Sequence, residues 1–149
     1  MGQYFEYFAA TVDTARGCAA DGPTAAGLDV AELKWVDPVV MVSELCAVVH
    51  GEELGCSGSA TGQWLGRFPT TLLSVPGDSE LIAVHGDTTA SLASVGDDRI
   101  GSLATAWAAS EYWVSAEDPE ELVHAVRRLR DTAVAASRPD HGLYAWWPE

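Results

Sequence analysis

The stretch TTLLSVPGDSELIAVH, residues 70–85, holds two short apolar runs on either side of the tetrapeptide Pro-Gly-Asp-Ser. Thr, Val and Ile are common in β-strands, and the intervening residues are typical of turns. The stretch therefore predicts a β-hairpin of strands 70–75 and 80–85. Because the strands of a hairpin run antiparallel, it favours an antiparallel sheet.

Two other segments are predicted to extend this sheet. The aromatic stretch QYFEYFAA (3–10) has apolar side chains on both faces, which predicts a central strand. LYAWW (143–147) predicts a last strand. The segment 23–36 has no clear pattern, and we expect it to be mostly loop. The glycine-rich segment 52–68 lacks periodicity and predicts the longest loop.

Helical patterns occupy the remaining intervals. In DPVVMVSELCAVVHG (37–51), Asp37 is expected to cap, Pro38 to take the first helical position and Gly51 to end the helix. The segment is apolar nearly all round, which predicts a buried core helix. Two further helices are predicted, from Asp13 to the stop at Gly22-Pro23 and over 87–95. Another is predicted over 97–113, with Ile100, Leu103 and Trp107 facing inward. The last is predicted from Asp118 to Arg138, and its inward-facing residues are Leu122, Val126, Leu129, Ala133 and Ala136.

These elements show no strand-helix-strand rhythm, so the predicted fold class is α+β. We expect a small, mostly antiparallel sheet of about four strands with four to five helices packed on one face. The 149 residues fit one globular domain over 1–149.

The net charge of −14 is the strongest global feature of the chain. It repels nucleic acids and anionic membranes, so we expect neither as a partner. The attractive partners are a cationic protein or a cationic small molecule. Part of the acidity is expected to be structural, because Asp37, Asp87, Asp97 and Asp118 fall where helices should begin and can act as N-caps.

The N-terminus lacks a basic, apolar leader, and no apolar run reaches the ~20 residues of a membrane span, so a cytoplasmic protein is expected. One lysine against seven arginines and no asparagine indicate a GC-rich bacterial source. The three cysteines, Cys18, Cys46 and Cys56, form no Cys-x-x-Cys pair, which argues against a disulfide framework and a zinc site. Cys46 is expected to be buried and Cys56 to be the most reactive thiol.

Two segments resemble each other: LCAVVHGEELG (45–55) and LIAVHGDTTAS (81–91) both contain Val-His-Gly-acid. A metal site would have to gather His50, Glu52 or Glu53, His85 and Asp87. Their spacing matches no ligand pattern, and each has a local explanation. His50 lies where one helix ends, and His85 lies where a strand ends, with Asp87 expected to cap the next helix. We therefore expect no metal and no cofactor.

No catalytic motif is present. The loop GCSGSATGQW (55–64) lacks the Gly-Lys-Ser/Thr of a phosphate-binding loop and the Gly-x-Ser-x-Gly of a nucleophile elbow. The catalytic residues, if any exist, stay unknown. Arg127, Arg128 and Arg130 are expected to form a solvated helix face, with Asp131 pairing to Arg127 or Arg128.

The chain holds six tryptophans, and exposed tryptophan is enriched at binding sites. Trp64 lies in a polar loop, and Trp146 and Trp147 are neighbours on a strand and must face opposite sides. The residues predicted to bind a partner or ligand are Trp64, His85, Asp87, Trp113 and Trp146.

The unexplained acidity and the missing motifs favour an acidic binding protein over an enzyme. Its partner would be a cationic protein, and an immunity- or antitoxin-like inhibitor is one concrete form. The alternative is a small-molecule-binding protein or enzyme for an aromatic or cationic metabolite, with a tryptophan-lined pocket and His85 or His50 as acid and base. A passive oligomerising subunit is a third hypothesis, and the oligomeric state stays open.

Overall fold

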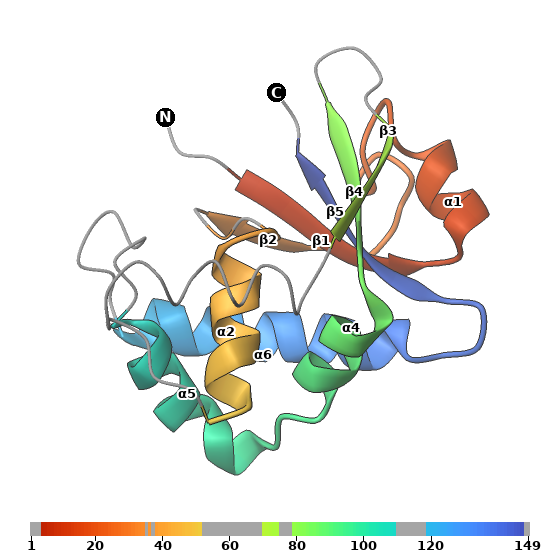
Figure 1. Cartoon of the computed structure of the whole chain (residues 1–149). Coiled ribbons are helices and arrows are strands. Elements are labelled where there is room, and N and C mark those ends of the chain that lie inside the picture. Colours follow the sequence, from red (N-terminus) through yellow and green to blue (C-terminus); the bar gives the residue numbers. More distant parts are fainter. Residues whose placement is uncertain are drawn as a thin grey trace.

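The computed structural model describes residues 4–34, 36, 38–51, 70–74, 79–109 and 119–147. Within these ranges the chain forms one antiparallel sheet with helices, and the predicted α+β class is confirmed (Figure 1). The sheet has five strands in the order β2-β1-β5-β4-β3. The strands are β1 (Tyr4–Ala10), β2 (Ala31–Lys34), β3 (Thr70–Ser74), β4 (Glu80–Val84) and β5 (Gly142–Trp147).

The predicted hairpin is β3 and β4, which pair antiparallel with Leu72 opposite Ile82. β1 is paired on both sides, but the middle strand is β5, the last in the sequence. The segment 23–36 was expected to be mostly loop, and the structure adds a short strand within it, β2. Ala31 and Leu33 are buried while Glu32 and Lys34 are exposed, but four residues are too short for that alternation to stand out in a sequence.

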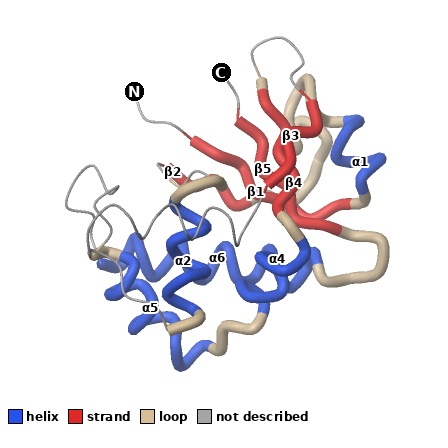
Figure 2. Tube along the Cα trace, in the orientation of Figure 1, coloured by secondary structure: helices blue, strands red, loops and turns tan. Residues whose placement is uncertain are grey.

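Helices lie on both sides of the sheet, unequally. The inner face, as we call it, is covered by the larger of the described helices, and the outer face by the short helix α1 (Val12–Gly17) and the turns that follow it (Figures 1 and 2). The described helices are α1 (Val12–Gly17), α2 (Met41–Val49), α4 (Gly86–Ala93), α5 (Ile100–Trp107), α6 (Pro119–Ala136) and the 3₁₀ helix η1 (Asp97–Arg99).

The inner face holds the larger core. All eight residues of α2 from Met41 to Val48 are buried, as its all-round apolar pattern predicted. The predicted apolar stripes of α5 and α6 are buried as well. At the centre, Trp107 is fully buried and its Nε1 donates a hydrogen bond of 3.0 Å to the carbonyl oxygen of Met41. This contact joins α5 to the first turn of α2.

The outer face holds a smaller core made of Phe8, Ala10, Leu81, Tyr144 and Trp146 from the sheet and Ala15, Cys18 and Ala19 from the covering segment. The indole Nε1 of Trp146 donates a hydrogen bond of 2.7 Å to the carbonyl of Ala19. Gly22 has a φ of +94°, and a Cβ there would lie 2.6 Å from the Trp146 ring. Only glycine allows the covering chain to lie this close.

Several helix starts differ from the prediction. α2 begins at Met41, and Pro38 lies in the turn before it, while Gly51 follows the helix end with the expected positive φ. The N-cap of α4 is His85, not Asp87: its Nδ1 accepts the Asp87 N–H at 3.3 Å. His85 has the extended backbone of an N-cap residue, whereas Asp87 already lies within the helix.

Two of the remaining predicted caps, Asp37 and Asp118, lie outside the described residues. The fourth, Asp97, is the first residue of η1, whose N-cap is Gly96. Its carboxylate accepts a hydrogen bond from Arg130 of α6. The Asp97 carboxylate therefore binds a distant arginine and does not cap a helix.

Candidate functional site

The sequence-predicted site residues lie in separate surroundings. Trp64 and Trp113 fall outside the described residues. His85 and Asp87 are exposed at the start of α4, with His85 Nδ1 3.8 Å from Asp87 Oδ2. Trp146 is buried in the outer core, whereas α4 packs on the inner face. The described structure does not bring Trp146 together with the other two.

The two similar histidine segments do meet, through His50 of the first and Ser91 of the second. His50 Nε2 lies 2.9 Å from Ser91 Oγ, which joins the end of α2 to α4. Ser91 Oγ donates its one proton to the carbonyl of Asp87 at 3.0 Å, so it accepts from His50. A histidine that donates to a serine is not its general base. Among the described residues, no three His, Cys, Asp or Glu side chains converge as metal ligands.

Of the three arginines of α6 that were predicted to form a solvated face, Arg127 is exposed, whereas Arg128 and Arg130 are partly buried and make tertiary contacts. The Arg130 side chain is only 15% exposed, and it donates to Val95 O, Asp97 Oδ1 and Asp131 Oδ1 at 2.9, 2.6 and 2.7 Å. Arg128 Nη2 donates to Val30 O at 2.6 Å. Asp131 therefore pairs with Arg130, and the contacts reach segments too distant in the chain for helix spacing to reveal.

These contacts have electrostatic consequences. The hydrogen bond and charge of Arg130 lower the pKa of Asp97, and its two carboxylate partners raise the pKa of Arg130.

Burial raises the pKa of the Cys46 thiol to about 12 and raises that of Cys18, where Glu6 adds to the effect. Both thiols are buried as Cys46 was expected to be, and Cys56 lies outside the described residues.

A cavity of about 260 Å³ lies beside the second half of α6, and sequence analysis missed it. It opens where the chain before β2 leaves the sheet. The last β1–β2 pair is Tyr7 with Ala31. Two positions further along, the same register would set Ala9 opposite Asp29, and both of these residues line the cavity. The lining residues are Ala9, Asp29, Arg128, Asp131, Thr132, Ala135, Arg138 and His141.

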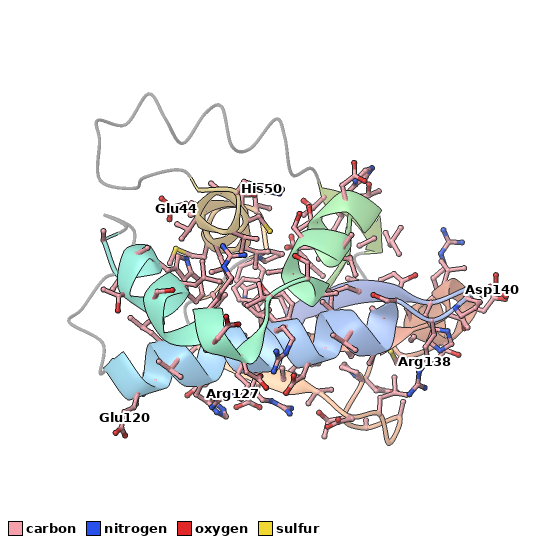
Figure 3. The ribbon with its side chains drawn as sticks, turned by 90° about the horizontal axis from the view of Figure 1, so that it is seen from below. Glu44, His50, Glu120, Arg127, Arg138 and Asp140 are labelled. Atoms are coloured by element: carbon pink, nitrogen blue, oxygen red, sulfur yellow. The ribbon has the colours of Figure 1, made fainter. Side chains whose placement is uncertain are left out.

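The α6 side of the cavity is a regular helical stripe. Arg128, Asp131, Thr132 and Ala135 follow one another at intervals of one or three residues, so they share a face of the helix, and Arg138 lies two residues beyond its end. Figure 3 shows α6 along its length, with Glu120 at one end and Arg138 at the other. The stripe is visible in the sequence, but what it faces depends on β2, which the sequence did not predict.

The chain matches no protein-family model, no curated protein and no solved structure in comparisons with known proteins. Within the described ranges, no helix has both the length and the apolar character to cross a membrane. Function must therefore be argued from the charges, contacts and cavity of this chain.

Proposed function

We propose that the protein is an acidic binding protein whose partner is a cationic protein, and that the partner contacts the outer face of the sheet near Tyr4 and Glu32. An immunity- or antitoxin-like inhibitor of a basic protein is one concrete form. The proposal rests on how the described charges are distributed.

Three arginines contribute contacts to the fold, while five exposed carboxylates are left in water. Arg99, Arg128 and Arg130 each donate to a main-chain carbonyl of a distant segment. In contrast, a set of exposed carboxylates has no hydrogen bond or ion pair among the described contacts: Asp13, Asp21, Glu32, Asp98 and Asp140. A partner's basic side chains would be attracted to these carboxylates without first displacing a basic group of the protein itself.

The observation that carries the proposal is a pair of like charges on the outer face. Glu6 of β1 lies directly opposite Glu32 of β2 in the antiparallel register. Glu6 is 7% exposed and accepts a hydrogen bond from the Thr24 hydroxyl, whereas Glu32 is exposed. Opposed like charges destabilise a sheet, and neither carboxylate has an ion pair in the described structure. A guanidinium or ammonium group from a partner would relieve this repulsion.

The surroundings of the pair suit an interface. Tyr4 occupies the next position on the same face of β1, opposite Lys34, and is 42% exposed. Aromatic side chains are enriched in protein interfaces, because they supply large contact area with few rotatable bonds. An exposed tyrosine next to an unpaired carboxylate offers both an anchor and a charge.

The substitution Glu32→Gln tests this placement. It removes the repulsion, so the free protein should be as stable as before or more stable by a few tenths of a kcal/mol, roughly. The same change should weaken partner binding about tenfold, because a charge-assisted contact is lost. Chemical denaturation gives the first quantity, and calorimetric titration with the isolated partner gives the second.

Asp98→Asn is the matched control. Asp98 is an exposed, unpaired carboxylate in η1, which belongs to the helical side of the molecule, and its removal changes the net charge equally. Binding should change little in this variant. Equal losses in both variants would contradict a specific contact at Glu32.

The alternative, a tryptophan-lined pocket, gains no support from Trp146. Its ring is buried in the outer core and its Nε1 is bound to Ala19 O. Trp107 likewise fills the inner core.

A further inference from the structure

We propose that two copies of this chain pair through β2, the strand at one edge of the sheet, and that each copy supplies the Lys34 ammonium that faces Glu32 of the other. The inference concerns the chain alone and does not depend on the proposed cationic partner. It rests on the position of β2 in the sheet and on the order of charges along it.

β2 is held in place as an edge strand. It is the first strand of the sheet order, so only its β1 side faces a described strand (Figure 1). Just outside its two ends, the carbonyl of Val30 accepts from Arg128 at 2.6 Å, and the carbonyl of Val36 accepts from the Tyr7 hydroxyl at 2.5 Å. These contacts fix the strand between them. An edge strand that is already extended can pair with another strand without rearranging.

The side chains of β2 alternate between the two faces of the sheet. Ala31 and Leu33 are buried on the inner face, whereas Glu32 and Lys34 are exposed on the outer face. When two sheets join edge to edge, residues that lie opposite each other must point to the same face. In a symmetric antiparallel pair, the two-fold axis then passes beside a residue of β2 and not between two residues.

The charges select one of these registers. An axis at Glu32 would set the two Glu32 side chains opposite each other, and an axis at Lys34 would do the same for the two lysines. An axis at Ala31 would leave both charged residues opposite positions outside β2. The axis at Leu33 sets Glu32 of each copy opposite Lys34 of the other, with the two Leu33 residues together on the inner face. Opposite charges on facing strands stabilise a sheet.

This register also counters a repulsion within each copy. Glu32 lies opposite Glu6 of β1 in the single chain, and in the dimer it would lie between Glu6 and Lys34 of the other copy. The net charge of −14 acts against any self-association. At 0.15 M ionic strength, however, charges more than about 8 Å apart are largely screened. Directly facing residues, with Cβ atoms about 5 Å apart, lie within that range.

The other edge strand, β3, is less suited to self-pairing. Its pairing with β4 shifts register between Leu72 and Ser74, and such irregularities protect an edge from further pairing. β3 also carries no charged residue, so charge selects no register there. Leu72 is 55% exposed and is the position at which a dimer through β3 would be disrupted.

The dimer has a consequence for the proposed partner. Lys34 of the other copy would occupy the surroundings of Glu32, where a partner's basic group would otherwise bind. Self-association and partner binding would therefore exclude each other at this edge.

Analytical ultracentrifugation of the full chain at 0.15 M salt tests the proposal with no partner present. We expect a reversible dimer of the unaltered chain. Glu32→Lys and Lys34→Glu should each weaken it at least tenfold, because both attractive pairs become like-charge pairs. The double variant with both substitutions should restore the dimer, and so should an equimolar mixture of the two single variants. An unaltered chain that stays monomeric at about 1 mM would overturn the proposal.

Asp98→Lys and Arg127→Glu are matched controls, because they change the net charge by the same amounts at exposed positions on the helical side. Each should leave the dimer unchanged. Equal weakening in the controls would show that net charge alone matters and would overturn the proposal. A dimer lost in Leu72→Lys but kept in Glu32→Lys would place the contact at β3 and overturn it as well. Thermal melting checks that all variants remain folded.

Lys34 is the only lysine of the chain, which allows a direct test of the register. A carbodiimide joins a carboxylate and an ammonium in direct contact through an amide bond, with loss of water. In a mixture of unlabelled and ¹⁵N-labelled chains, we expect mass spectrometry to find Lys34 of one chain joined to Glu32 of the other. Dimers that yield no such mixed-label peptide would contradict this register.

Discussion

The two faces of the sheet are built differently. Among the described elements, α2, α4, α5 and α6 cover the inner face with a core around Trp107, whereas α1, of six residues, and the turns after it cover the outer face. A buried carboxylate lies on each side, Glu6 in the outer core and Glu44 in α2. The outer core relies on two close contacts of Trp146, with Ala19 and Gly22. The inner core is the larger of the two, and the smaller outer core depends on a few close contacts.

The largest effect is expected at the inner face. Trp107→Ala removes a fully buried indole and its hydrogen bond to Met41 O, so the free energy of unfolding should fall by about 3–5 kcal/mol. Urea denaturation followed by circular dichroism measures the change. A loss below about 1 kcal/mol, the size expected at an ordinary surface site, would show that α5 is not part of the main core.

A smaller loss is expected at the outer face with Gly22→Ala. The new methyl group would overlap the Trp146 ring and also occupy a left-handed backbone conformation, which together should cost about 2–4 kcal/mol. Gly27→Ala is the control, because Gly27 also has a positive φ of +79° but has no neighbour within 4 Å. It should cost only about 1 kcal/mol. Equal losses would mean that the contact with Trp146 contributes nothing.

The reaction rates of two buried cysteines show how readily each face opens, and the measurement needs no substitution. Cys18 is buried under the short outer cover, and Cys46 is buried in α2 on the inner face. Local opening should expose Cys18 at a lower free energy, so it should react with a thiol reagent at least tenfold faster than Cys46. Mass spectrometry of peptides after timed alkylation measures both rates. Faster reaction of Cys46 would reverse the proposed order of stability.

The smallest effect is a pH dependence on the helical side. Arg130 lowers the folded-state pKa of Asp97, so this pair stabilises the protein above the ordinary pKa of an aspartate. The stabilisation should be lost as the pH falls through the lowered value. Asp97→Asn should therefore flatten the acid end of the stability profile, while Asp98→Asn, which removes an unpaired carboxylate, should leave it unchanged. Melting temperatures between neutral pH and about pH 3 provide the measurement.

Long elements and local turns could be predicted from the sequence, and contacts between distant segments could not. The hairpin, α2, α6 and β5 follow from apolar periodicity and glycine or proline boundaries. β2 was missed because four residues give too short a pattern. The role of Arg130 was missed because its partners at Val95 and Asp97 are more than thirty residues away.

The cavity was missed for the same reason. It exists because the chain before β2 diverges from β1 at the height of Ala9, and only the folded arrangement places Asp29 against α6. Of the predicted site residues, the sequence correctly placed His85 at a strand end, but its role as the cap of α4 depends on the backbone conformation.

The most direct test of the central claim is native mass spectrometry of the protein recovered with its partner from its native host at low salt. The account predicts a stoichiometric complex with a basic protein that dissociates as the salt concentration rises, because exposed charge contacts are screened within about 10 Å at 0.1 M ionic strength. A complex with Glu32→Gln should dissociate at lower salt than one with Asp98→Asn. A partner that is acidic, or a complex that is insensitive to salt, would contradict the account.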